Sequence, residues 1–230
     1  MRDTGIIVAI DGPAGAGKST TAKAVAAKLG YLYLDTGAMY RAVALSVLRA
    51  DVDPDDADAV GEHAESLNVE QTTSTHGTRT VIGGEDVSDQ IRTQEVSNTA
   101  SRVAVHPRVR RLLVALQQSI GKAGGIVLEG RDTTTAIFPD AELKVFLDAT
   151  VEERAQRRFR ELTGSGNRVG IEALRQEIQE RDERDRRTQS QHGPWPTPEA
   201  ISVDTTGLTI EAQVDRIVLL ARDRGAEGEI

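Results

Sequence analysis

The 230-residue chain contains no cysteine, which excludes disulfides, thiolate nucleophiles and cysteine-ligated zinc. Aromatic residues make up only 3% of the sequence, too few for the stacking platforms that bind single-stranded nucleic acid. The formal net charge is −8, so no overall basic field attracts a polyanion. No apolar run approaches the roughly 20 residues of a membrane-spanning helix, and the N-terminus has no signal-peptide pattern. We therefore expect a cytoplasmic protein that binds neither nucleic acid nor membranes.

The pattern of apolar residues predicts an α/β fold. Short apolar runs typical of buried strands alternate with segments of helical periodicity, which favours a central parallel sheet covered on both faces. The predicted strands cover residues 6–10, 31–34, 126–128, 144–147 and 201–203. Ligands bind beyond the carboxyl ends of the strands in such sheets, so the polar residues that follow each run are the candidate site residues.

Residues 12–19 fit the phosphate-binding pattern G-x-x-x-x-G-K-[ST]. An apolar strand precedes them and a helical pattern follows, which is the context that the motif requires. The glycines let backbone N–H groups surround a polyphosphate, and the helix dipole favours its charge. Lys18 is expected to reach the β- and γ-phosphates, and Ser19 to ligate Mg²⁺. The predicted ATP-binding residues are Gly12, Pro13, Ala14, Gly15, Ala16, Gly17, Lys18, Ser19 and Thr20.

Two further segments modify this core. Residues from about 53 to 101 break the alternation and contain a predicted hairpin that turns at Gly83-Gly84, so we expect an inserted lobe. Two charged helices over 151–162 and 171–187, joined by a glycine-containing loop, suit a mobile lid. A single domain is predicted, with its core at 1–35, 102–150 and 199–225, the lobe at about 36–101 and the lid at about 151–188.

Arginines favour phosphoryl transfer over other uses of a phosphate loop. The guanine-reading Asn-Lys-x-Asp of switch GTPases is absent, and Leu128-Glu129 only faintly matches the acidic strand end of helicases and transport ATPases. Transfer of a phosphoryl group between two anions needs dispersed positive charge and exclusion of water. Arginines at predicted strand ends and in the lid supply that charge: Arg41, Arg131, Arg157 and Arg181. The alternative is that the lid arginines form only a solvated surface.

The sequence resembles the bacterial cytidylate kinases, members of the nucleoside monophosphate kinase family, over nearly its whole length. Several separate motifs in the same order carry the resemblance. They are IDGPAGAGKST at 10–20, LDTGAMYR at 34–41, GEDVS at 84–88 with Ile91-Arg92, PRVR at 107–110, EGRD at 129–132, FPDA at 138–141 and ERD at 180–182.

The resemblance implies transfer of the ATP γ-phosphate to CMP or dCMP by a P-loop kinase with a monophosphate-binding lobe and a lid. It implies that Arg157 reaches the ATP phosphates and that Asp185 holds the ribose. The remaining residues it assigns to the CMP site are Arg41, Arg131 and Arg181 at the phosphate, Ser101, Arg110 and Asp132 at the cytosine, and Thr36 and Tyr40 nearby. Lys18, Arg131, Arg157 and Arg181 are the expected catalytic residues.

The chemistry of cytosine agrees with this assignment. A carboxylate that accepts from the exocyclic amine and an arginine that donates to the acceptor edge complement the base. Uracil has a carbonyl acceptor in place of the amine, so the Asp132 carboxylate would face a second acceptor with no hydrogen between them. Without the family resemblance, a structural interpretation of these residues is as well supported as a functional one. Arg131 and Asp132 could then be a local ion pair at a strand end, and Asp185 a surface charge of a helix.

The chain departs from the family pattern at two places. Thr133-Thr134 follow Asp132 where the family usually has isoleucine or methionine and then glycine, and the loop is expected to be stiffer. Thr188 stands where the family places another arginine, and no Pro-Leu turn follows. We predict that Arg187 substitutes for that arginine and contacts CMP. The protein is expected to be a monomer acting on small molecules. The alternatives are a related kinase for UMP, dTMP or shikimate, or a regulatory nucleotide-binding module without turnover.

Overall fold

The structure is a computed structural model that describes residues 2, 4–74, 77–164, 169–189 and 194–227. Its contacts divide the chain into two units. The first unit combines Met1–Tyr31 with Ala123–Ile230, and the second consists of Leu32–Lys122. The second unit therefore includes the predicted lobe at 36–101 and extends beyond it.

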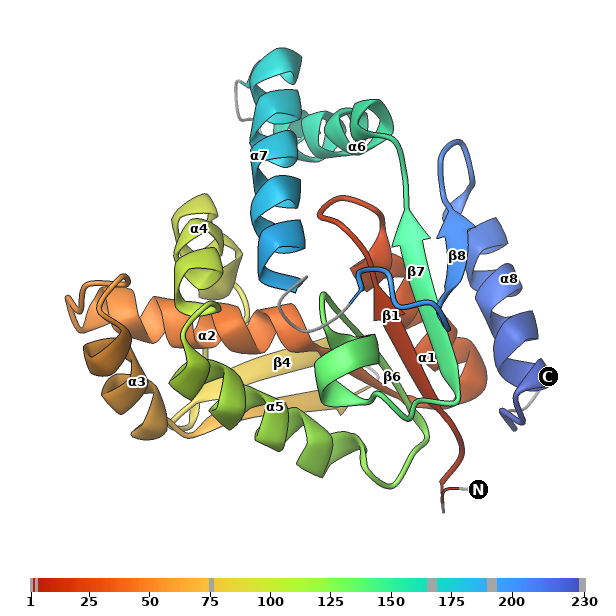
Figure 1. The fold of residues 1–230 in the computed structure, drawn as a ribbon, viewed down its shortest axis with the longest axis horizontal. Coiled ribbons are helices and arrows are strands. Elements are labelled where there is room, and N and C mark those ends of the chain that lie inside the picture. The colour runs from red at the N-terminus through yellow and green to blue at the C-terminus, as the bar shows by residue number, and fades with distance from the viewer. Residues whose placement is uncertain (1, 3, 75–76, 165–168, 190–193, 228–230) are drawn as a thin grey trace. The chain divides into compact units, whose positions relative to one another are not determined.

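A parallel sheet forms the centre of the first unit (Figure 1). Its strands lie in the order β6-β1-β7-β8, and β1 pairs with β6 and β7 on its two sides. All five residues of β1 are buried, as expected for a strand covered on both faces. This architecture confirms the predicted α/β class with a central parallel sheet. The strands are β1 (Ile7–Asp11), β6 (Ile126–Gly130), β7 (Leu143–Asp148) and β8 (Ile201–Asp204).

Helices α1 (Lys18–Leu29) and α8 (Ile210–Asp223) pack against each other in the same unit. The Thr209 side chain accepts a hydrogen bond from the Ala212 N–H and caps α8. A short π-helical turn, η2 (Thr133–Ile137), follows β6. This turn begins directly after Asp132, so its geometry affects the backbone position of Asp132, the predicted base-reading residue.

The two predicted lid helices are present as α6 (Val151–Gly164) and α7 (Ile171–Gln189). They pack against each other (Figure 1). The predicted glycine loop between them lies largely at 165–168, outside the described residues.

The second unit combines helices with a three-stranded antiparallel sheet in the order β3-β4-β5. The predicted hairpin is confirmed, because β4 and β5 pair across Gly83 and Gly84, both with positive φ. Strand β3 was not predicted, since Glu70, Gln71 and Thr72 give it no apolar alternation. The elements of the second unit are β2 (Leu32–Asp35), α2 (Thr36–Arg49), α3 (Ala57–Glu65), β3 (Val69–Ser74), β4 (Gly77–Ile82), β5 (Glu85–Asp86), η1 (Gln90–Arg92), α4 (Gln94–Val103) and α5 (Pro107–Gly121).

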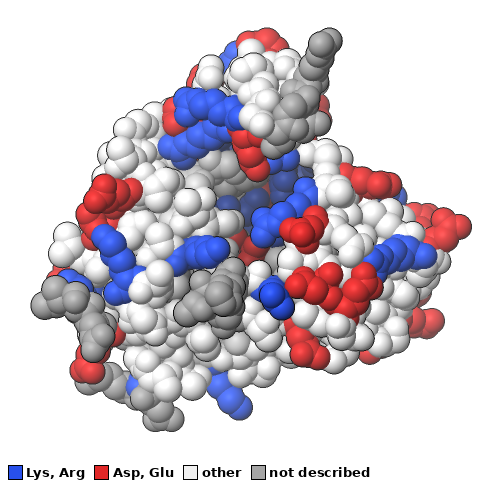
Figure 2. All heavy atoms as spheres, turned by 180° about the vertical axis from the view of Figure 1, so that it is seen from behind, with Lys and Arg blue, Asp and Glu red and all other residues white. Residues whose placement is uncertain are grey.

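The surface carries both signs of charge. On the face drawn in Figure 2, lysine and arginine side chains gather near the middle of the view, and aspartate and glutamate side chains lie beside and around them. Within the described ranges, no helix is both long and apolar enough to cross a membrane.

Candidate functional site

The glycine loop joins the end of β1 to the start of α1. Gly12, Gly15 and Gly17 have φ values of 150°, 77° and 92°, which other residues rarely adopt. A Cβ on Gly12 would lie 2.0 Å from the Leu147 carbonyl oxygen, so the backbone passes too close to β7 for any side chain. Helix α1 begins at Lys18, and its N-terminal N–H groups adjoin the loop. The predicted order of strand, glycine loop and helix is therefore present.

Lys18 is buried against this loop. Its Nζ donates a hydrogen bond to the Pro13 carbonyl oxygen at 2.9 Å. Burial, with the nearby charge of Arg131, lowers the pKa of Lys18 to about 7, although the Glu129 and Asp185 carboxylates act in the opposite direction. An anion bound in the loop would favour the protonated amine. The lysine is thus placed to respond to phosphate.

Ser19 points to a carboxylate at the end of β6. Its hydroxyl donates to Glu129 Oε1 at 2.7 Å, and Glu129 is buried. A hydroxyl and a carboxylate together offer the hard oxygen ligands that suit Mg²⁺. No cluster of three or more metal-binding acids or histidines occurs in the described part of the chain. Sequence reasoning missed Glu129 as a site residue, although its place at a strand end was a signal.

Arg131 and Asp185 meet beside Lys18. Arg131 Nε donates to Asp185 Oδ2 at 2.7 Å, which joins the end of β6 to α7. Burial alone would raise the pKa of Asp185, but the guanidinium groups of Arg131 and Arg181 hold it below its ordinary value. The same pair raises the pKa of Arg131 despite its burial. The structure therefore brings together Lys18, Arg131, Arg181 and Asp185, from three separate segments.

Asp132 follows Arg131 and is buried. Its carbonyl oxygen accepts from the Ala136 and Ile137 N–H groups at 2.9 and 3.2 Å, so Asp132 is the residue that caps the start of η2. The backbone of the predicted base-reading residue is thus held at the start of a tight turn.

Arg154 joins the lid to the phosphate loop and was not predicted as a site residue. Its Nη1 donates to the Ala14 carbonyl oxygen at 3.2 Å, and its guanidinium forms a bidentate pair with Asp182 at 2.9 and 2.6 Å. Because Asp182 lies on α7, one buried arginine connects both lid helices with the loop. The arginine-rich pattern of α6 signalled such a role but did not distinguish Arg154 from its neighbours.

Arg157 lies on the same helix and also beside the loop. Its guanidinium donates to the Thr205 carbonyl oxygen at 2.7 Å and to Thr205 Oγ1 at 3.1 Å. The Thr205 hydroxyl in turn donates to the Ala16 carbonyl oxygen at 3.2 Å. The predicted ATP-contacting arginine is therefore next to the loop, with its Nη donors directed to Thr205 and its Nε directed to Glu153 at 2.9 Å.

Arg187 lies near the end of α7, away from these contacts. Its side chain is 76% exposed and lies 3.7 Å from Glu183, one helical turn earlier. Residues 190–193, where the family's Pro-Leu turn is missing, fall outside the described residues.

The predicted acceptor residues of the second unit lie on three helices. Arg41 on α2 pairs with Asp35 at 3.0 Å, while its buried Nε makes no hydrogen bond to a described residue. Ser101 on α4 donates to the Ser97 carbonyl oxygen at 3.3 Å. Helix α2 contacts both α4 and α5. These contacts place three further predicted residues on neighbouring helices: Thr36 and Tyr40 on α2, and Arg110 on α5.

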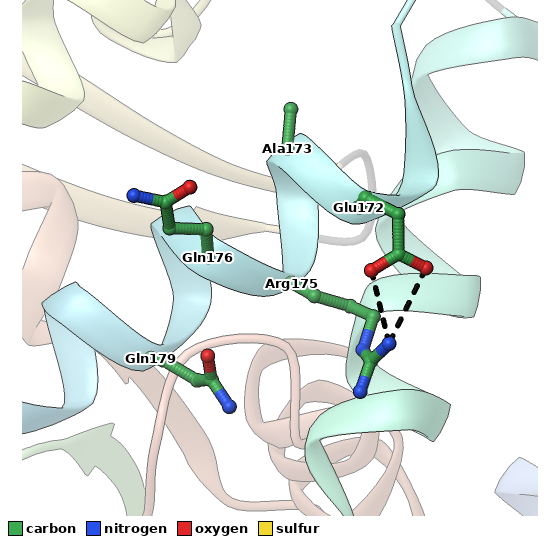
Figure 3. A pocket seen from close by; sticks show the side chains of 5 residues that line it. All are labelled: Glu172, Ala173, Arg175, Gln176 and Gln179. Atoms are coloured by element: carbon green, nitrogen blue, oxygen red, sulfur yellow. Dashed lines mark hydrogen bonds and ion pairs between the residues drawn. The ribbon is translucent and has the colours of Figure 1, made fainter.

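A separate hollow lies on α7 (Figure 3). All the residues that line it belong to α7, and Arg175 is held there by Glu172 at 3.0 Å. Arg175 also pairs with Glu152 of α6 at 3.0 Å. Its charge is therefore occupied in joining the two lid helices, and the hollow contains none of the predicted substrate residues.

Comparisons with known proteins identify the family. The sequence model of the family described as Cytidylate kinase matches residues 8–223. The chain is 46% identical over 220 residues to "Cytidylate kinase" of Geobacillus sp. (strain WCH70), covering 95% of this chain and 97% of the relative. It is 41% identical over 230 residues to "Cytidylate kinase" of Geobacter sp. (strain M21), covering 100% and 98%.

A solved structure shares the fold. The uncharacterized protein from Eubacterium ventriosum ATCC 27560 aligns with a TM-score of 0.53 and 15% identity, over 95% of this chain and 98% of that one. The likeness is one of architecture.

Proposed function

The chain belongs to the cytidylate kinase family, and from this we propose that it transfers the γ-phosphoryl group of ATP to CMP or dCMP. A phosphate oxygen of the acceptor attacks the γ-phosphorus, and the bond to the β–γ bridging oxygen breaks. The products are ADP and CDP or dCDP. The observation that carries the proposal is the cluster of Lys18, Arg131 and Asp185 beside the glycine loop.

On the donor side, the backbone N–H groups of residues 12–17 would surround the ATP phosphates. Lys18 would lie at the β- and γ-phosphates, where negative charge develops during transfer. Arg157 would turn from Thr205 to the phosphates, and Thr20 completes this side of the site. Ser19 and Glu129 supply oxygen atoms that suit Mg²⁺, and the bound ion would neutralise phosphate charge.

On the acceptor side, the family resemblance assigns Arg41, Arg131 and Arg181 to the CMP phosphate. The Asp185 carboxylate would hold the ribose through the oxygen that Arg131 does not use. Asp132 would accept from the cytosine amine, and Arg110 would donate to the acceptor edge of the base. Three residues complete the site: Ser101, Thr36 and Tyr40.

We place this reaction in the pyrimidine nucleotide metabolism of the cytoplasm, catalysed by a monomer that acts on small molecules only. The absence of cysteine fits a reducing compartment. The formal net charge of −8 argues against a protein that coats nucleic acid.

A panel of acceptors tests the proposed function. ADP release would be measured with CMP, dCMP, UMP, dTMP and shikimate at saturating ATP. The highest kcat/KM is expected for CMP or dCMP. A preference for UMP, dTMP or shikimate would identify a related kinase instead. No turnover with any acceptor would favour a regulatory nucleotide-binding module.

Arg187→Ala tests whether this residue replaces the arginine missing at Thr188. Under our hypothesis kcat/KM for CMP falls by roughly tenfold, because a charged hydrogen bond to the acceptor phosphate is lost. The contact requires the end of α7 to rewind by one residue when CMP binds, since Arg187 is exposed without ligand. KM for ATP should remain nearly constant. Steady-state kinetics with each substrate varied in turn gives both quantities.

Arg186→Ala is the matched control, because Arg186 is the exposed neighbour on the same helix. An exposed charge near a helix C-terminus contributes only a few tenths of a kcal/mol. The control should therefore match the parent. If both variants behave like the parent, Arg187 is a solvated surface charge and takes no part in binding CMP.

A further inference from the structure

A buried carboxylate connects the two halves of the proposed site. Asp11 is the last residue of β1 and is 1% exposed. Its Oδ1 accepts from the Thr133 N–H at 2.9 Å and from the Thr133 hydroxyl at 2.7 Å. Its Oδ2 accepts from the Thr134 N–H at 3.0 Å and from the Thr134 hydroxyl at 2.5 Å. Two consecutive threonines thus donate all four hydrogen bonds.

The positions of these residues in the chain matter. Asp11 directly precedes Gly12, the first residue of the phosphate loop, and Thr133 directly follows Asp132. Strands β1 and β6 lie side by side, with Asp11 opposite Gly130. One carboxylate therefore links the loop proposed to bind ATP to the turn that begins at the proposed cytosine-reading residue.

The threonine hydroxyls compensate for an unfavourable charge. Burial raises the pKa of Asp11, and the negative charge of Asp132 acts in the same direction. The hydrogen bonds from Thr134 and Thr133 oppose this rise. Without the two hydroxyls, the buried carboxylate keeps only its backbone donors. We expect it then to take up a proton or to shift, and either change weakens the hydrogen bonds that hold the turn after Asp132.

We propose that Thr133 and Thr134 are positioning residues for the acceptor nucleotide, which act through Asp11 to hold Asp132 at a set distance from the phosphate loop. These residues form one of the two places at which the chain departs from the usual family pattern. The inference deepens the proposed function and rests on it, because Asp132 must read the base for its position to affect specificity.

The variant Thr133→Val/Thr134→Val removes both hydroxyls and keeps the side-chain shape and the backbone donors. KM for CMP is expected to rise by roughly tenfold, and the preference for CMP over UMP to fall by a similar factor. KM for ATP should stay within about twofold, because the backbone of the phosphate loop is unchanged. A merely structural role would lower the active fraction, and with it kcat, equally for both acceptors and leave both KM values unchanged.

Thr133→Ser/Thr134→Ser is the matched variant, since it restores both hydroxyls and should return KM for CMP to the parent value. If the double valine variant does not fold by circular dichroism, each single valine variant is measured in the same way, with a smaller rise in KM expected. Parent values of KM and of the CMP-to-UMP ratio in the valine variants would overturn the inference. Failure of the parent itself to phosphorylate CMP would instead refute the proposed function.

Discussion

Lys18→Ala is expected to lower the rate of phosphoryl transfer by about 10²–10³ while the protein stays folded. The lysine amine is buried against the phosphate loop, where the phosphates of ATP gain negative charge in the transition state. Alanine leaves that charge uncompensated in a site from which water is excluded. Single-turnover kinetics at saturating ATP and CMP measures the effect, and circular dichroism checks the fold.

Lys28→Ala is the matched control for this variant. Lys28 lies on the same helix, and its exposed amine pairs with Asp215 at 2.6 Å. Exposed pairs of this kind contribute little, so the control should behave like the parent. A rate for Lys18→Ala within about threefold of the parent would contradict the assignment of residues 12–19 as the ATP phosphate site.

Because the pKa of Lys18 is lowered, both the free energy of unfolding and the affinity for ATP are expected to depend on pH. Between about 7 and the ordinary lysine value of 10.5, the unfolded chain holds a proton that the folded chain lacks, so this group makes the free energy of unfolding rise with pH. ATP binding has the opposite dependence, because the phosphates favour the protonated amine. Above pH 7 we expect net proton uptake when ATP binds and an affinity that weakens as pH rises. Calorimetry in buffers of different ionisation enthalpy measures the uptake, and Lys18→Arg should abolish it.

Asp132→Asn is expected to reduce base discrimination more than it slows phosphoryl transfer. The carboxamide both donates and accepts, so it can pair with the cytosine amine or with the uracil carbonyl. A site that holds a buried partner for one polar group can reject an analogue by up to ~10⁴. The discrimination that can be lost is therefore large. The quantity to measure is the ratio of kcat/KM for CMP to that for UMP.

Asp140→Asn makes the same chemical change on an exposed side chain eight residues later, where the carboxylate pairs with Arg2. This control should leave the CMP-to-UMP ratio at the parent value. An unchanged ratio in Asp132→Asn would mean that the buried carboxylate serves only as a local charge partner of Arg131.

The sequence by itself determined the features that depend on neighbouring residues. The order of strand, glycine loop and helix around residues 12–19 follows from local periodicity and from the backbone freedom of glycine. The cap at Thr209 and the turn at Gly83-Gly84 also need only a few residues in a row. The polar residues after β6 were predicted to lie at a ligand-binding edge, because the carboxyl ends of parallel strands share that edge.

Only the tertiary structure decided which distant side chains became partners. Arg154 is one of several arginines on α6, and nothing in its local sequence distinguishes it from its neighbours. Its contacts with Ala14 and Asp182 depend on how α6 and α7 pack beside the loop. The sequence likewise showed Thr133 and Thr134 only as a departure from a pattern. Their partner, Asp11, lies 122 and 123 residues away and meets them because β1 and β6 are adjacent in the sheet. Hydrogen bonds between such distant residues depend on strand register and burial, which local periodicity does not specify.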